Sequence, residues 1–230
     1  MTFLELVQRY RQEIGGARGS SGPVTVVGQV GELKRAVDNI ADAWVKIQNL
    51  HPNWKFQRQT ATWTSTAGQA TYTLAECGIA AGTFGHWLRE PLRYYVTASG
   101  LNTEQRIFPT SYDCWRETWN FSANRSVTSY PHQWAETPTK GIAFGPAPVA
   151  GLTFSAEYYR GPVRLTASSD VPLLPEPHDH MLIVWYAMKN YARFETAPEV
   201  YAQAVENLTP MLTQLRNDQL PRPSLAGALA

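Results

Sequence analysis

The chain has 230 residues, of which 43% are hydrophobic, 17% charged and 12% aromatic, and its formal net charge is +1. A chain of this length can form one large domain or two small ones with a substantial core. The near-neutral charge argues against nucleic-acid-binding and membrane-surface proteins, and no apolar run approaches the ~20 residues that cross a bilayer.

Two helices are predicted in the first 52 residues. In the first, over residues 2–15, Thr2 and Glu5 have the spacing of a capping box. This N-terminus lacks the basic start and apolar run of a signal peptide. The second helix, over residues 29–50, follows a loop rich in glycine and serine. Its apolar residues fall three or four positions apart, as on one helical face: Leu33, Val37, Ile40, Trp44 and Ile47.

The periodicity changes to that of β-strands between about residues 55 and 165. Segments 60–66 and 70–74 alternate and are rich in β-branched residues, which predicts a hairpin with its turn at residues 67–69. Further strands are expected at 92–97, near 142–144 and at 152–159. A short helix is expected to begin near Pro109, where helical spacing relates Tyr112, Trp115, Arg116 and Trp119.

Helical periodicity returns at residues 178–195 and again at residues 197–218. Pro198 suits the first turn of the last helix, and Pro210 should kink or divide it. The elements together predict an α+β fold, in which N- and C-terminal helices form a bundle and an antiparallel β domain is inserted. We assign residues 1–52 and 170–219 to the helical domain, residues 53–169 to the β domain and residues 220–230 to a tail. The expected helical core comprises Leu33, Val37, Ile40, Trp44, Met181, Trp185 and Met188.

The sequence offers no catalytic, metal-binding or cofactor-binding residues. His178 and His180 flank an aspartate, but residues two apart on a helix do not share a face, and Asp179 suits a helix start. There is no nucleophile elbow or phosphate-binding lysine loop. Cys77 and Cys114 lack metal-site spacing, and we interpret them as free thiols of a protein made in a reducing cytoplasm.

Two features of composition leave alternatives open. The aromatic residues suit either an aromatic-rich core or a surface covered by other proteins. The basic residues near the N-terminus alternate with glutamates and are typical of a mixed solvated face, with contact to passing DNA as the alternative. They are Arg9, Arg11, Arg18, Lys34 and Arg35.

The order of segments resembles the head–tail adaptor, or connector, proteins of tailed bacteriophages, especially those of short-tailed phages. The resemblance lies in the segments 2–7, 31–48, 60–74, Phe144-Gly-Pro-Ala-Pro148, Tyr158-Tyr-Arg-Gly-Pro-Val163, 170–178, 187–195 and 201–219. It spans nearly the whole chain and is least evident over residues 82–130.

This resemblance implies a structural virion protein at the head–tail junction, which assembles in the host cytoplasm and is not an enzyme. Such proteins form a ring of twelve copies that joins the portal to tail or nozzle proteins and extends the channel for genomic DNA, without sequence-specific contact. The helical part lies toward the portal and the β part outward or toward the tail.

The tail is expected to dock on the portal. It is too short and too poor in apolar side chains to fold on itself, and its prolines restrict the free chain. The residues expected to make the contact are Leu220, Pro221, Pro223, Leu225 and Leu229.

Two other classes of protein remain open from the residues alone. A carbohydrate-binding tail module could use the tryptophans for stacking on sugars. A virion-associated cell-wall hydrolase would need an acidic pair in a cleft, and no such pair can be named. The tryptophans concerned are Trp54, Trp63, Trp87, Trp115, Trp119 and Trp134.

Overall fold

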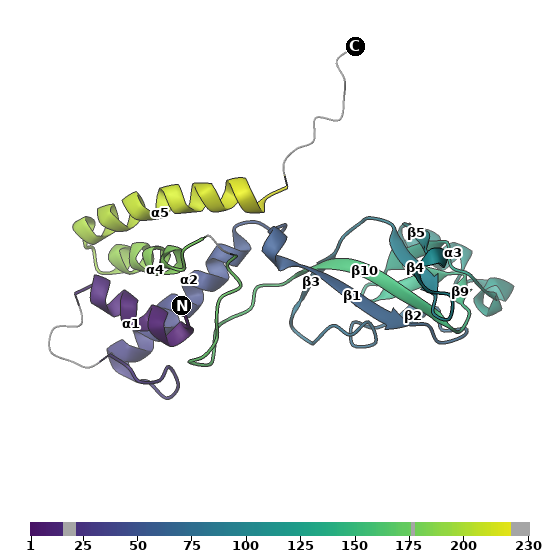
Figure 1. Ribbon diagram of the computed structural model, residues 1–230, viewed down its shortest axis with the longest axis horizontal. Helices are drawn as coiled ribbons and strands as arrows, with labels where there is room; N and C mark the ends of the chain where they lie inside the picture. The colour runs from purple at the N-terminus through teal and green to yellow at the C-terminus, as the bar shows by residue number, and fades with distance from the viewer. Residues whose placement is uncertain (16–21, 176–177, 222–230) are drawn as a thin grey trace, which may run out of the picture. The chain divides into compact units, whose positions relative to one another are not determined.

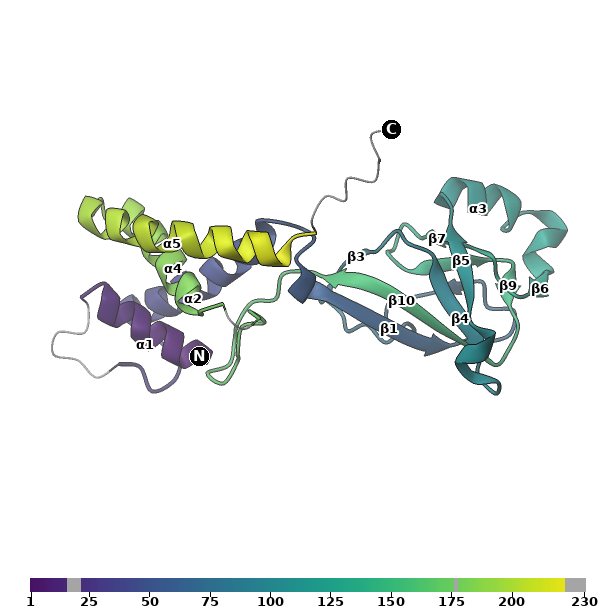
Figure 2. The same cartoon turned by 45° about the horizontal axis from the view of Figure 1, so that its top comes forward.

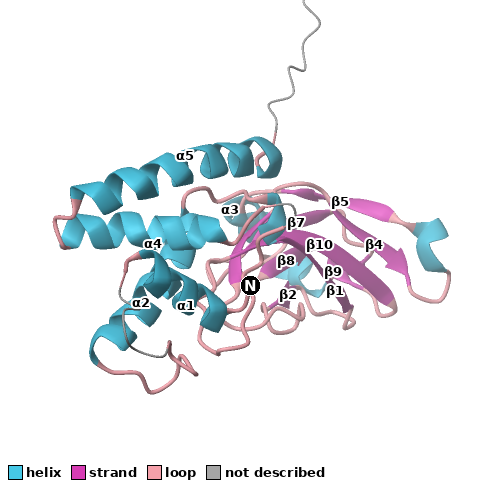
Figure 3. Ribbon diagram, turned by 60° about the vertical axis from the view of Figure 1, so that its left-hand side comes forward, coloured by secondary structure: helices cyan, strands magenta, loops and turns pink. Residues whose placement is uncertain are grey.

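A computed structural model describes residues 1–15, 22–175 and 178–221, and in it the chain divides into two compact units (Figure 1). One unit comprises residues 1–57 and the chain from residue 162 onward, and the other comprises residues 58–161. Among the described residues, the longer helices all belong to the first unit and the strands to the second (Figure 3). The predicted α+β fold with helices at both ends is therefore confirmed.

Four α-helices build the first, helical unit: α1 (Phe3–Glu13), α2 (Gly31–Asn49), α4 (Met181–Phe194) and α5 (Pro198–Gln219). The predicted capping box starts α1, because the Glu5 amide donates to Thr2 Oγ1 at 3.3 Å and the Thr2 amide donates to Glu5 Oε2 at 2.8 Å. Helix α4 packs against each of the other three helices. It is therefore the centre of this unit.

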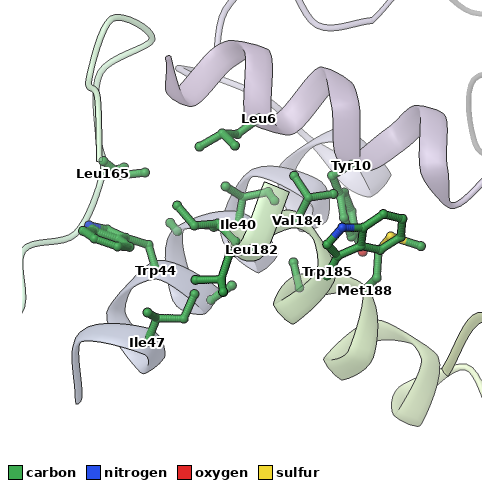
Figure 4. Close-up of a cluster of buried hydrophobic side chains, with 14 of the residues drawn as sticks. Leu6, Tyr10, Ile40, Trp44, Ile47, Leu165, Leu182, Val184, Trp185 and Met188 are labelled. Atoms are coloured by element: carbon green, nitrogen blue, oxygen red, sulfur yellow. The ribbon is translucent and has the colours of Figure 1, made fainter. Parts of the chain in front are cut away.

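The helical core lies between α1, α2 and α4 (Figure 4), and α5 adds Ala204, Leu208 and Leu215 to it. Four of the predicted core residues are buried: Ile40, Trp44, Trp185 and Met188. Three are only half-buried and not largely buried as predicted: Leu33, Val37 and Met181. Of these, Val37 and Met181 still pack against the edge of the core. The buried face of α2 includes Ala36 and Ala43 in place of Leu33 and Val37. The small side chains of these alanines let the neighbouring helices approach closely.

Helix α5 runs from Pro198 to Gln219 without a break at Pro210. Of the two predicted effects of this proline, a kink or a division of the helix, the division does not occur. Pro210 and Glu206 are both exposed, so the carbonyl group that the proline leaves without a donor lies on the solvent side of the helix. Hydration there lets the helix continue.

The second, β unit is a curled sheet (Figure 2). Its strand order is β1-β10-β4-β5-β7-β8-β2, and β3 also pairs with β10. Most pairs are antiparallel, as predicted, but β5 and β7 are parallel, as are β6 and β9 in a separate two-stranded sheet. The strands are β1 (Arg58–Thr64), β2 (Thr71–Tyr72), β3 (Phe84–Trp87), β4 (Leu92–Val96), β5 (Gln105–Pro109), β6 (Thr128–Ser129), β7 (Gln133–Glu136), β8 (Ile142–Gly145), β9 (Ala147–Pro148) and β10 (Leu152–Arg160).

The predicted hairpin between residues 60–66 and 70–74 does not form. Strand β1 pairs with β10, and β2 pairs with β8. The predicted turn is present, because the Gln69 amide donates to the Thr66 carbonyl at 3.1 Å. Alternation in the sequence identifies a strand and its buried face, but it does not identify the strand's partner.

Aromatic side chains fill the interior of the β unit. The rings of Phe144 and Phe154 stack with their centroids 4.4 Å apart. Outside the curled sheet lies helix α3 (Tyr112–Thr118), the short helix expected near Pro109, which begins after the cap residue Ser111. Its Trp115 donates from Nε1 to the Phe144 carbonyl at 2.8 Å and so fixes α3 to β8. Much of the aromatic excess therefore serves the core of this unit.

Candidate interaction surfaces

The start of the predicted docking tail is bound to its own helical unit. Leu220 is half-buried against the helical core, and its amide donates to the Arg216 carbonyl at 3.1 Å. Pro221 is exposed. Three of the predicted docking residues lie outside the described residues: Pro223, Leu225 and Leu229. Leu220 thus serves as an internal anchor at the end of α5.

Two further contacts hold the end of α5. His178 Nε2 lies 2.9 Å from Asp218 Oδ2, and Lys55 Nζ donates to the Asp218 carbonyl at 2.8 Å. The hydrogen bond from His178 lowers the pKa of Asp218 below its ordinary value. The point from which the tail leaves is therefore fixed within the helical unit.

The two histidines of the metal-like motif have different partners. His178 faces Asp218, whereas Nδ1 of His180 lies 2.7 Å from the Met1 amine. Burial and then the nearby ammonium group lower the pKa of His180, which favours its neutral form. Asp179 Oδ1 accepts from the Met181 amide at 2.8 Å, as expected of a residue at a helix start. Within the described parts of the chain, no three potential metal-binding side chains come together.

The basic residues near the N-terminus mostly form ion pairs on helical surfaces. The distances between charged groups are 2.6 Å for Arg9–Glu13, 2.7 Å for Lys34–Asp38 and 3.3 Å for Arg35–Glu195. Arg11 is buried and so does not belong to a solvated face, and Arg18 lies outside the described residues. As far as its residues are described, this surface is mixed in charge.

The six tryptophans considered for sugar stacking do not form an open surface. Five of them are buried: Trp54, Trp63, Trp87, Trp115 and Trp134. Trp119 is half-buried, and its Nε1 donates to Gln133 Oε1 at 2.9 Å. Five of the six residues therefore offer no indole face on which a sugar ring could stack.

Exposed aromatic side chains of the β unit lie instead at Phe108 on β5 and on residues 121–130, which we call the arm. Every residue of the arm is exposed, with Phe121 at 65% and Tyr130 at 53% of their full exposure. Asn124 Nδ2 donates to the Thr118 carbonyl at 2.8 Å and Arg125 Nε to the Asn120 carbonyl at 2.9 Å, which ties the arm to the end of α3. Sequence reasoning left this stretch unassigned.

A cleft of about 640 Å³ opens at the other end of α3. It is lined by residues 109–112, which lead into α3, by Arg89 and by part of the segment from Trp134 to Lys140. Glu136 and Lys140 in its wall pair with each other at 3.2 Å. Arg89 is exposed and forms no ion pair with another described residue. The cleft therefore presents one uncompensated positive charge beside aromatic and proline walls.

Comparisons with known proteins bear on both units. The chain matches the family described as SU10 adaptor protein over residues 1–225. No curated protein matches it. In the described part of the chain, none of the helices combines the length and the apolar character needed to cross a membrane.

Proposed function

The chain belongs to the SU10 adaptor protein family, a family of structural phage adaptors, and we propose that copies of it form a ring that joins the portal to the tail of a phage particle. The observation that carries this proposal is the extent of the family match, which includes both the helical and the β unit. The role of a phage adaptor is structural.

The ring would contain twelve copies at the head–tail junction, as the resemblance implies. In a closed ring of identical subunits, one face of each copy binds a different face of the next copy. The ring closes when the rotation from copy to copy adds up to a full turn. A chain of two compact units can supply separate faces for neighbours, portal and tail. Genomic DNA would pass through the ring without sequence-specific contact, and the near-neutral net charge is compatible with such passage.

In this arrangement the tail after α5 docks on the portal. The support is the fixed start of the tail, where Leu220 and Asp218 are held by the helical unit, together with its prolines and leucines. A fixed starting point and a restricted chain lower the entropy lost when the tail orders on a partner.

The stoichiometry of particles tests the ring. Quantitative mass spectrometry of purified particles should give equal numbers of adaptor and portal chains, and cryo-electron microscopy should show the adaptor as a ring at one vertex. An adaptor that is absent from the head–tail junction, or present in a number unrelated to the portal, would contradict the proposal.

A truncation tests the docking tail. Removing residues 221–230 keeps the anchor Leu220, so the subunit should stay folded while its incorporation into portal-containing heads is lost. A matched control replaces the same residues with a Gly/Ser segment of equal length, which should fail equally if the tail binds through its own side chains. Normal incorporation of either variant would show that the tail does not dock on the portal.

A further inference from the structure

We propose that neighbouring copies contact each other through their β units, with the arm of one copy, residues 121–130, seated in the cleft of the next. This inference rests on the proposed ring and assigns its side-to-side contact. It gives a role to two features that the family match leaves without one, the exposed aromatic arm and the cleft at the start of α3.

The positions of arm and cleft on α3 favour a contact between copies. Residues 109–112 line the cleft and lead into the start of α3, whereas the arm begins after the last turn of α3. The arm includes strand β6, which lies beyond the end of α3 in Figure 2. A helix of seven residues separates the two features by about 10 Å. The arm is tied to the far end of α3, so it is held away from its own cleft. A contact between two different surfaces of identical copies is heterologous, which is the type that closes rings.

Charge complementarity next to the arm, at the end of α3, supports the same pairing. The one charged residue within the arm, Arg125, donates from Nε to the Asn120 carbonyl of its own chain. Glu117 is exposed at the base of the arm, and Arg89 is exposed at the cleft. Neither residue forms an ion pair with another described residue. Since Glu136 is already paired with Lys140, Arg89 is the group in the cleft that a carboxylate from the next copy would satisfy.

The arm is also shaped before binding. Its hydrogen bonds to Thr118 and Asn120 and the pairing of β6 with β9 hold it in place. The ring of Tyr130 stacks on that of the buried Tyr94 with the centroids 6.1 Å apart. Little further entropy is therefore lost on binding, and Phe121 is left as a large apolar side chain of the kind found at the centres of interfaces.

Charge reversal tests the contact. Arg89→Glu and Glu117→Arg each place like charges at every interface of a uniform ring, so each variant alone should lower incorporation into particles roughly tenfold. Supplied together, the two variants can alternate around a ring with an even number of copies. At each contact, the side chain at position 117 of one variant then meets a side chain of opposite charge at position 89 of the other. The mixture should therefore restore incorporation, which an effect on folding or on portal binding would not do. Arg106→Glu, on the exposed face of β5, is the matched control and should incorporate normally.

Single reversals without effect, or a mixture that stays defective, would overturn the inference. Photo-crosslinking provides a second test, because a benzophenone amino acid at exposed position 121 does not disturb the core. In particles, its adduct should lie on residues 109–112 or 134–140 of another copy, and an adduct on the portal or tail would overturn the inference. If the wild-type chain forms no ring in particles, the proposed function itself fails.

Discussion

At the scale of single residues, Gly145 shows how tightly the β unit is packed. A side chain at this position would bring its Cβ to 2.2 Å from Cδ1 of Trp119, whose indole is held by Gln133. We expect Gly145→Ala to lower the free energy of unfolding of the β unit by about 1–3 kcal/mol, because the indole must move or the strand must shift. Urea unfolding followed by tryptophan fluorescence measures the change.

A double variant identifies the cause. If the clash with the indole is responsible, adding Trp119→Leu should make the loss smaller than the sum of the two single losses. Additive losses would show that the glycine is needed for another reason.

The two cysteines should differ in reactivity. Burial raises the pKa of Cys77 to about 12, so only about one thiol in 10,000 is ionised at pH 8, and the side chain is inaccessible. Cys114 is exposed. We expect a thiol reagent at pH 8 to label one cysteine of the folded protein and both after denaturation, as counted by intact mass. Cys114→Ser should abolish labelling of the folded chain, and rapid labelling of that variant would contradict the burial of Cys77.

At the scale of elements, α2 shows why helical periodicity locates a buried face only approximately. Ile40 is fully buried between helices, whereas Val37 lies at the edge of the same face and is half-buried. Ile40→Ala should therefore cost about 2–5 kcal/mol of stability, and Val37→Ala, as the matched change at the edge, about 1 kcal/mol or less. Thermal unfolding of both variants checks the order. Equal losses of stability in the two variants would mean that the buried face of α2 is centred between Val37 and Ile40.

At the scale of the whole molecule, the two units raise the question of independent folding. Residues 58–161 have their own aromatic core, and their two ends are neighbours, since Arg58 pairs with Tyr159. We propose that this segment folds alone and expect it to unfold in one cooperative step, as followed by near-ultraviolet circular dichroism. A fragment without fixed tertiary signals would show that the β unit depends on the helical unit.

How much could be predicted differs between the two units. The helices followed from local spacing, and the Thr2–Glu5 capping box is seen as predicted, because both depend on residues within one or two turns. The arm and the cleft could not be predicted. Phe121 and Tyr130 look in the sequence like any other core aromatics, and Arg89 and Glu136 lie far apart along the chain.

The sequence by itself determined the fold class, the four long helices and the resemblance to phage adaptors. Helical periodicity depends on residues close together in the chain, and the order of segments can be read directly along it. Only the tertiary structure decided that β1 pairs with β10, that five of the six candidate tryptophans are buried, and that a charged cleft opens beside α3. These features depend on contacts between residues distant in the chain. A strand's alternation defines which side chains face inward, but the energy of strand pairing depends on the partner, which the local pattern does not contain.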